Sequence, residues 1–134
     1  MIQKEGNINS RPINKKVLKT LDNITHLFHL ASPRINRCAQ YNSEGHKTIA
    51  DGGFNVVDYC AKNNVKLFFS STASVYQKPK VFPIKEETNC NPHTIYGAGK
   101  LYTEHLIKSY ENARWAALRG IKIVSISKFY KHVY

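Results

Sequence analysis

Three short apolar runs, separated by longer stretches of helical pattern, constrain the fold of this chain most strongly. They cover residues 24–30, 65–69 and 121–126. The first two have the length and composition of strands buried on both faces. Helices are predicted between the runs, over 47–63 and 95–118. Because strands alternate with helices in this order, we expect an α/β domain with right-handed crossovers and a parallel sheet.

Polar segments separate these elements. The Asn-rich stretch 33–45 and the proline-containing stretch 77–94 are both predicted to be loops. The first residues are polar, basic and without periodicity, so we expect a flexible basic arm over 1–14. One domain is then expected over 15–134, since the chain is too short to hold two.

Two dipeptides mark the predicted 47–63 helix. Gly52 and Gly53 fall in its middle, where glycine is expected to weaken it. Asn63 and Asn64 follow its last apolar residues and are expected to end it.

Composition narrows the class of protein. With 42% hydrophobic residues the chain is globular rather than disordered. Its apolar runs are all too short to cross a membrane, and the first residues lack the apolar core of a secretory signal. Three cysteines, Cys38, Cys60 and Cys90, form no C-x-x-C pair, which argues against a metal site and a disulfide framework. We therefore expect a cytoplasmic protein.

The formal net charge of +11 raises the possibility of a nucleic-acid partner. The 20 lysines and arginines are scattered rather than gathered into one block, however. No zinc-finger spacing or helix-turn-helix signature accompanies them. A solvated basic surface is the better interpretation, and a basic nucleic-acid-binding protein is kept as an alternative.

A tyrosine and a lysine near the start of the last predicted helix carry the chemical signal. Tyr96 and Lys100 are four residues apart, so they share one helix face. Hydroxyl residues 70–72 follow the preceding strand, and the fold can bring them beside that face. A phenol, a cation that favours its ionised form and an orienting hydroxyl together make a proton-transfer device.

These motifs resemble the extended short-chain dehydrogenase/reductase superfamily, in particular its NAD-dependent nucleotide-sugar epimerase/dehydratase branch. The resemblance rests on several ordered stretches rather than on the Tyr/Lys pair alone. They are residues 25–32, 55–61, 65–76, 83–86, 91–92 and 96–100. It implies a partial Rossmann-like parallel sheet with flanking helices. By the same resemblance, the chain lacks the N-terminal Gly-rich βαβ unit, since no G-x-x-G-x-x-G occurs, and the C-terminal substrate domain.

The resemblance also implies roles for individual residues. Tyr96 is expected to act as general base, Lys100 to favour the phenolate and bind the nicotinamide ribose, and Thr72 to bond the substrate hydroxyl. The expected cofactor is NAD, with NADP left open. The residues expected to contact it are Leu30, Ala31, Ser32, Ser70, Tyr96, Lys100 and Phe129.

The implied parent activity is epimerisation of a nucleotide sugar by transient hydride transfer. Ala73 and Ser74 stand where sugar dehydratases of this branch carry Asp and Glu, which favours an epimerase. Ile49 replaces the family's Asn, and the absent segments are expected to impair activity. A catalytically inactive remnant or interaction module is therefore a second alternative. A homo-oligomer or a complementing chain is expected to cover the incomplete sheet.

Overall fold

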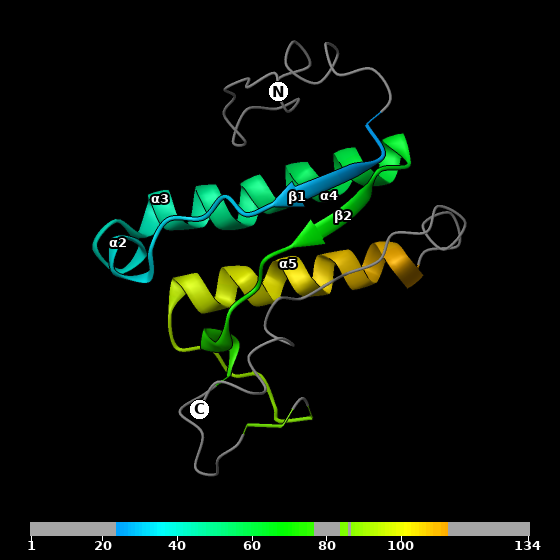
Figure 1. Cartoon of the computed structure of the whole chain (residues 1–134). Helices are drawn as coiled ribbons and strands as arrows, with labels where there is room; N and C mark the ends of the chain where they lie inside the picture. Colours follow the sequence, from blue (N-terminus) through cyan, green and yellow to red (C-terminus); the bar gives the residue numbers. More distant parts are fainter. Residues whose placement is uncertain (1–23, 77–83, 86, 113–134) are drawn as a thin grey trace.

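The computed structural model describes residues 24–76, 84–85 and 87–112. The predicted basic arm, the 121–126 strand and Phe129 lie outside these ranges. In the described part, the elements run from a first strand through a helical segment to a second strand, and then to a long helix (Figure 1). None of the described helices is both long and apolar enough to span a membrane.

Two strands form the sheet in the described part of the chain. β1 (His26–His29) pairs in parallel with β2 (Lys66–Phe69), and Leu27 lies opposite Leu67. The predicted parallel arrangement is therefore confirmed. Both strands end at the same edge of the sheet because they run in the same direction, and the residues that follow them meet there.

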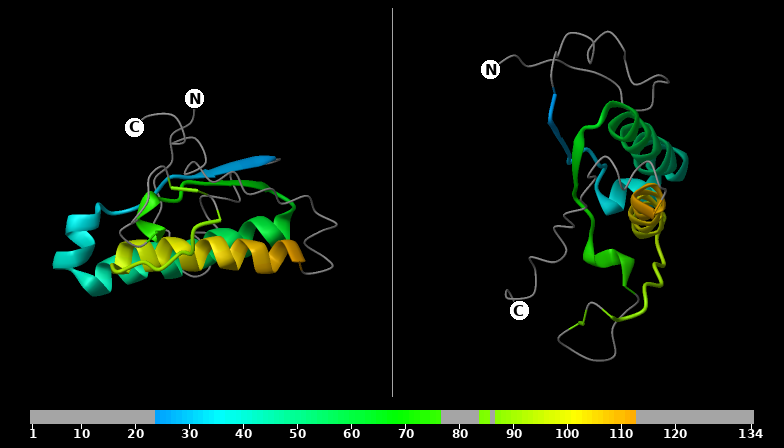
Figure 2. Two further views of the ribbon diagram at one scale, coloured as in Figure 1. Left: turned by 90° about the horizontal axis from the view of Figure 1, so that it is seen from below. Right: turned by 90° about the vertical axis from the view of Figure 1, so that its right-hand side faces the viewer.

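The two long helices lie on the same side of the strands (Figure 2). α4 (Gly52–Asn63) connects β1 to β2, and α5 (Ile95–Asn112) follows β2. The buried residues between them and the sheet form one core, which includes Val57, Cys60, Leu67, Phe69 and Ile107. The helix 95–118 was predicted with the correct first residue, and its last part lies beyond the described residues.

The expectation that both strands are buried on both faces is wrong for the described residues. Leu67 and Phe69 of β2 are buried, but Lys66 of the same strand is exposed. Phe28 of β1 is 64% exposed, although its ring stacks on that of Phe68 at 4.5 Å. The physical reason is that α4 and α5 cover only one face of the sheet.

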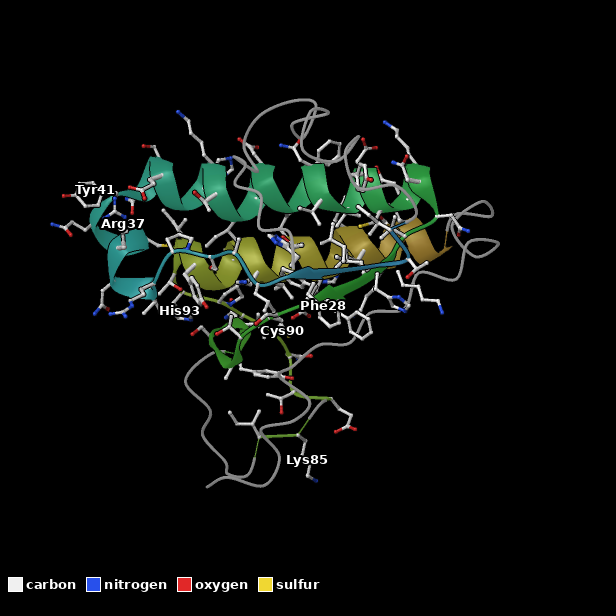
Figure 3. All side chains as sticks on the ribbon, turned by 45° about the horizontal axis from the view of Figure 1, so that its top comes forward. Phe28, Arg37, Tyr41, Lys85, Cys90 and His93 are labelled. Carbon is white, nitrogen blue, oxygen red and sulfur yellow. The ribbon has the colours of Figure 1, made fainter. Side chains whose placement is uncertain are left out.

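The expected loop at 33–45 is also wrong, because the segment forms two short helices. α2 (Ile35–Gln40) and α3 (Asn42–His46) meet at a turn that Figure 3 shows through the labelled Arg37 and Tyr41. Arg37 holds Glu44 with two hydrogen bonds, of 2.7 and 3.0 Å. Cys38 is buried against Gly45, where a Cβ would lie 3.0 Å from the Cys38 Cβ. These contacts join residues seven positions apart across the turn between the two helices, and the polar composition of the segment did not reveal them.

The predicted helix 47–63 is confirmed, with an irregular start. η1 (Lys47–Asp51), a single π-helical turn, leads directly into α4. Gly53 has a low helix propensity, but the absence of a side chain at this position allows α5 to pack closely against α4. A Cβ at Gly53 would lie 2.6 Å from Thr103 Oγ1. Asn64 ends α4 in the left-handed conformation, with φ 57°, and its backbone N–H donates a hydrogen bond to Cys60 O.

The connection from β2 to α5 is a loop with one short helical turn in its described part. Thr72 begins the turn η2 (Ala73–Val75), and Tyr76 pairs with Cys90 in an isolated antiparallel bridge. Thr94 then starts α5, because its hydroxyl accepts a hydrogen bond of 3.0 Å from Gly97 N. The expected loop 77–94 agrees with the structure wherever its residues are described.

Candidate functional site

The hydroxyl residues predicted to serve the site lie at the carboxyl end of β2. Ser70 N donates a 3.3 Å hydrogen bond to His29 O, which extends the strand pairing by one residue. Thr72 is half-buried, and its Oγ1 accepts a 3.2 Å hydrogen bond from Ser74 N. The Thr72 side chain therefore lies at the start of a defined turn.

Lys100 of α5 reaches this same strand end. Its side chain is almost fully buried, with 2% exposed, and its Nζ donates a 2.7 Å hydrogen bond to Ser70 O. The same Nζ lies 4.8 Å from the ring centroid of Phe69 and 6.0 Å from that of Tyr96. The structure thus brings Tyr96, Lys100 and the residues after β2 together, as the sequence spacing predicted.

Burial controls the charge of Lys100. Removal from water lowers its pKa from 10.5 to about 8, although Cys38 acts in the opposite direction. The aromatic ring of Phe69 below the ammonium partly offsets the loss of water. The ammonium is thus held within reach of the Tyr96 ring, and its proton is more easily lost than that of an exposed lysine.

His29 is a second buried titratable group at this edge of the sheet. It is 4% exposed, and its ring lies 5.6 Å from that of Phe69. Burial and, second, the charge of Lys100 lower the pKa of His29 from 6.5 to about 4. His29 is therefore neutral near pH 7. The sequence spacing gives no indication that this histidine lies beside Lys100.

The residues predicted to line a cofactor directly follow β1. Leu30 and Ala31 are exposed, and Ser32 is half-buried, with its hydroxyl donating to Pro33 O at 3.2 Å. Because β1 and β2 are parallel, these residues and Ser70 share one edge of the sheet. Phe129, the last of the predicted set, lies outside the described residues. Ligands of parallel α/β sheets bind at this carboxyl edge.

Sequence reasoning missed one interaction at the site. The hydroxyl of Ser71 donates to the carboxylate of Glu104, across 33 positions of sequence. The available signal was periodicity, because Glu104 is four residues after Lys100 and thus lies on the same face of α5. Nothing in the local sequence, however, indicated which residue that carboxylate would meet.

A separate hollow of about 450 Å³ lies beside α5 and η1. It is lined by His46, Ala50, Asp51, Ile95, Ala98, Gly99 and Tyr102. None of the described residues that are predicted for catalysis or cofactor binding lines it. Ile49, which the resemblance places at the position of the family's Asn, is buried nearby, with Cγ2 2.9 Å from where a Cβ on Gly99 would lie. Ile49 therefore serves helix packing.

Comparison with known proteins decides the family. Residues 3–128 match the NAD dependent epimerase/dehydratase family. The chain belongs to this family. The resemblance inferred from the motifs is thereby confirmed, and so is the Rossmann-type α/β class, which the solved structures below share.

Individual relatives in this family are UDP-glucose 4-epimerases. The chain is 36% identical to that of Corynebacterium glutamicum over 67 residues, which are 50% of this chain and 20% of the relative. It is 46% identical to that of Azospirillum brasilense over 64 residues, or 48% of this chain and 17% of the relative. The matched segments therefore span a fifth or less of these relatives.

Solved structures match over most of the chain. UDP-glucose 4-epimerase from Bifidobacterium longum, in complex with NAD⁺ and UDP, superposes with a TM-score of 0.77 at 26% identity, covering 91% of this chain and 36% of that one. The enzyme from Brucella ovis, in complex with NAD, gives a TM-score of 0.76 at 22% identity, covering 91% and 36%. The second likeness shows the fold alone.

Proposed function

We propose that this chain carries the proton-transfer part of an NAD-dependent nucleotide-sugar epimerase. One observation carries the proposal. Lys100 Nζ is fixed by Ser70 O two residues before Thr72, and it lies 6.0 Å from the ring centroid of Tyr96. The UDP-glucose 4-epimerases among the relatives support a UDP-sugar as substrate class.

Each of the three residues has a role that follows from its chemistry. Tyr96, as phenolate, takes the proton of a sugar hydroxyl and later returns it. Lys100 favours that phenolate because a positive charge nearby stabilises a negative one. Thr72 donates to or accepts from the same sugar hydroxyl and so fixes its direction. Bound NAD supplies the acceptor and then the donor of hydride at the sugar carbon.

The residues at the carboxyl edge fit such a cofactor. An ammonium has three donors. On Lys100, Ser70 O takes one of them and the Phe69 ring lies close to the same nitrogen, so in the proposed complex a ribose hydroxyl would accept a remaining donor. Leu30 and Ala31 are exposed at the same edge and offer apolar surface to a nicotinamide ring. Both NAD and NADP are tested, because the two cofactors differ at the adenosine ribose and none of the roles proposed here involves that ribose.

The test uses the full chain with NAD and UDP-glucose, and follows formation of UDP-galactose by NMR. Calorimetric titration with NAD and with NADP accompanies it. Tyr96→Phe should lower turnover at least about 100-fold while leaving the circular dichroism spectrum unchanged. Tyr102→Phe is the matched control, because Tyr102 lies exposed on the same helix, and it should retain wild-type turnover. Equal rates for Tyr96→Phe and wild type would overturn the assignment.

A further inference from the structure

Helix α5 contacts the segment after β2, residues 70–74, through three of its residues. Gly97 packs directly on the Ser74 carbonyl, where a Cβ would not fit. Lys100 Nζ donates a hydrogen bond to Ser70 O, and the Glu104 carboxylate accepts a hydrogen bond from the Ser71 hydroxyl. The first two contacts are accounted for by packing and by the proposed function, whereas the third is not.

The position of Ser71 gives the third contact its importance. Ser71 directly precedes Thr72, whose Oγ1 and carbonyl both accept hydrogen bonds from the next turn, from Ser74 N at 3.2 Å and Val75 N at 3.4 Å. Any rotation of the backbone at Ser71 would therefore carry the Thr72 hydroxyl with it. Glu104 restrains that rotation from a helix that also carries Tyr96.

The hydrogen bond between Ser71 and Glu104 is strong enough to restrain the backbone at Ser71. A hydroxyl that donates to an ionised carboxylate makes a stronger hydrogen bond than a neutral pair does. Both Ser71 and Glu104 are half-buried, so water competes less for the bond than it would at an exposed site. Ser71 is held by a long-range partner, 33 residues away, rather than by its own turn.

We propose that Glu104 is a positioning residue, which acts through Ser71 to hold the Thr72 hydroxyl at a fixed place relative to Tyr96 and Lys100. The inference rests on the proposed function, because Thr72 has a catalytic role only there. The contact between Glu104 and the 70–74 segment is nevertheless a property of the fold, and it is measurable without any substrate.

The test compares three variants of the full chain by two measurements. Ser71→Ala removes the donor, Glu104→Leu removes the acceptor, and Glu104→Gln keeps an acceptor oxygen at the same reach. Hydrogen exchange of the Ser74 and Val75 amides reports on the turn that Thr72 begins. Turnover of UDP-glucose reports on catalysis. Ser109→Ala is the matched control, since its hydroxyl donates a hydrogen bond to Leu106 O within α5 and lies on the exposed side of that helix.

Ser71→Ala and Glu104→Leu should each speed exchange of both amides on the order of tenfold, as expected for a lost hydrogen bond to a charged group. They should lower kcat by a similar factor, with KM changed little. The double variant should be no worse than either single one. Glu104→Gln should restore both quantities to within about threefold of wild type, and Ser109→Ala should match wild type.

Unchanged exchange in Ser71→Ala would overturn the inference, as would Glu104→Gln behaving like Glu104→Leu in a folded protein. Failure of the proposed function looks different. A wild-type chain without turnover refutes that function, while faster exchange in the variants would still establish the contact. Normal turnover in Ser71→Ala with faster exchange would show that the contact is structural and does not position Thr72.

Discussion

At the scale of single residues, the edge of the sheet is distinguished by two buried nitrogen bases. His29 and Lys100 are both nearly inaccessible to water, and burial lowers the pKa of each. Two neighbouring cations would repel one another there, so a neutral His29 allows Lys100 to keep its proton near pH 7. The single ammonium is then directed at Ser70 O and the Tyr96 ring.

The lowered pKa of His29 predicts a loss of stability in acid. Between pH 6.5 and about 4 the unfolded chain binds a proton on this histidine and the folded chain does not. The contribution of neutral His29 to the unfolding free energy should therefore be fully present above pH 6.5. It should fall as the pH drops toward 4, by at most about 3 kcal/mol. Urea unfolding at a series of pH values measures this.

His29→Leu should remove the decrease in unfolding free energy between pH 6.5 and about 4. It should also change the unfolding free energy by an amount that does not depend on pH. His26→Leu is the matched control, since it removes an exposed histidine of the same strand, and it should retain the wild-type loss. An identical acid-side loss in His29→Leu would show that another group is responsible.

At the scale of elements, small residues set how closely the helices approach. Gly53 of α4 faces Thr103 of α5, and Gly99 of α5 faces Ile49 of η1. Thr103 is fully buried, with Oγ1 donating to Gly99 O at 3.0 Å. A close approach of α5 brings Lys100, one residue after Gly99, within hydrogen-bond distance of the strand end.

The contact between Gly53 and Thr103 predicts a destabilising effect for an added methyl group. Gly53→Ala should cost about 1–3 kcal/mol despite the better helix propensity of alanine, because its Cβ would lie 2.6 Å from Thr103 Oγ1. Thermal or urea denaturation measures the loss. In a Thr103→Ala background the same change should be neutral or stabilising, and equal costs in both backgrounds would contradict the packing explanation.

The end of α4 gives a second prediction at this scale. Asn64 adopts φ 57°, a conformation that costs a side chain with a Cβ about 1 kcal/mol more than glycine. Asn64→Gly should be neutral or stabilising, whereas Asn64→Val should destabilise by about 1–2 kcal/mol. The denaturation midpoints of the two variants, each compared with that of the wild type, measure these changes in stability. A Val variant as stable as the Gly variant would exclude this conformation in solution.

At the scale of the whole molecule, the described part is a two-layer structure. The helices cover one face of the β1–β2 pair (Figure 2). The aromatic side chains of Phe28 and Phe68 stack on each other at the opposite face. The core is therefore one-sided, and the same type of side chain differs greatly in burial according to the face on which it lies. Phe69 is 1% exposed, against 64% for Phe28.

This asymmetry predicts unequal costs for one substitution at two places. Phe69→Ala should lower the unfolding free energy by about 3–5 kcal/mol, because it opens a cavity in the core and removes the ring below Lys100. Phe28→Ala should cost only about 1 kcal/mol, mainly from the lost stacking on Phe68. Equal costs, measured by urea denaturation, would mean that the outer face is also covered in solution.

The sequence by itself determined the order of the two described strands and the two long helices, the parallel pairing, the first residue of α5 and the end of α4. Each of these depends on local patterns, such as apolar runs, the Tyr96 to Lys100 spacing and Asn64. The family was also inferred from the ordered motifs, and the match of residues 3–128 to the NAD dependent epimerase/dehydratase family confirms it.

Only the tertiary structure decided which faces are buried and which distant groups meet. The helices at 33–45 are stabilised by Cys38 packing on Gly45 and by the pair of Arg37 with Glu44, which polar composition concealed. The contact of Glu104 with Ser71 joins residues 33 positions apart. The contact between Ser71 and Glu104 depends on how α5 packs against the sheet, and local sequence patterns carry no information about which residues that packing brings together.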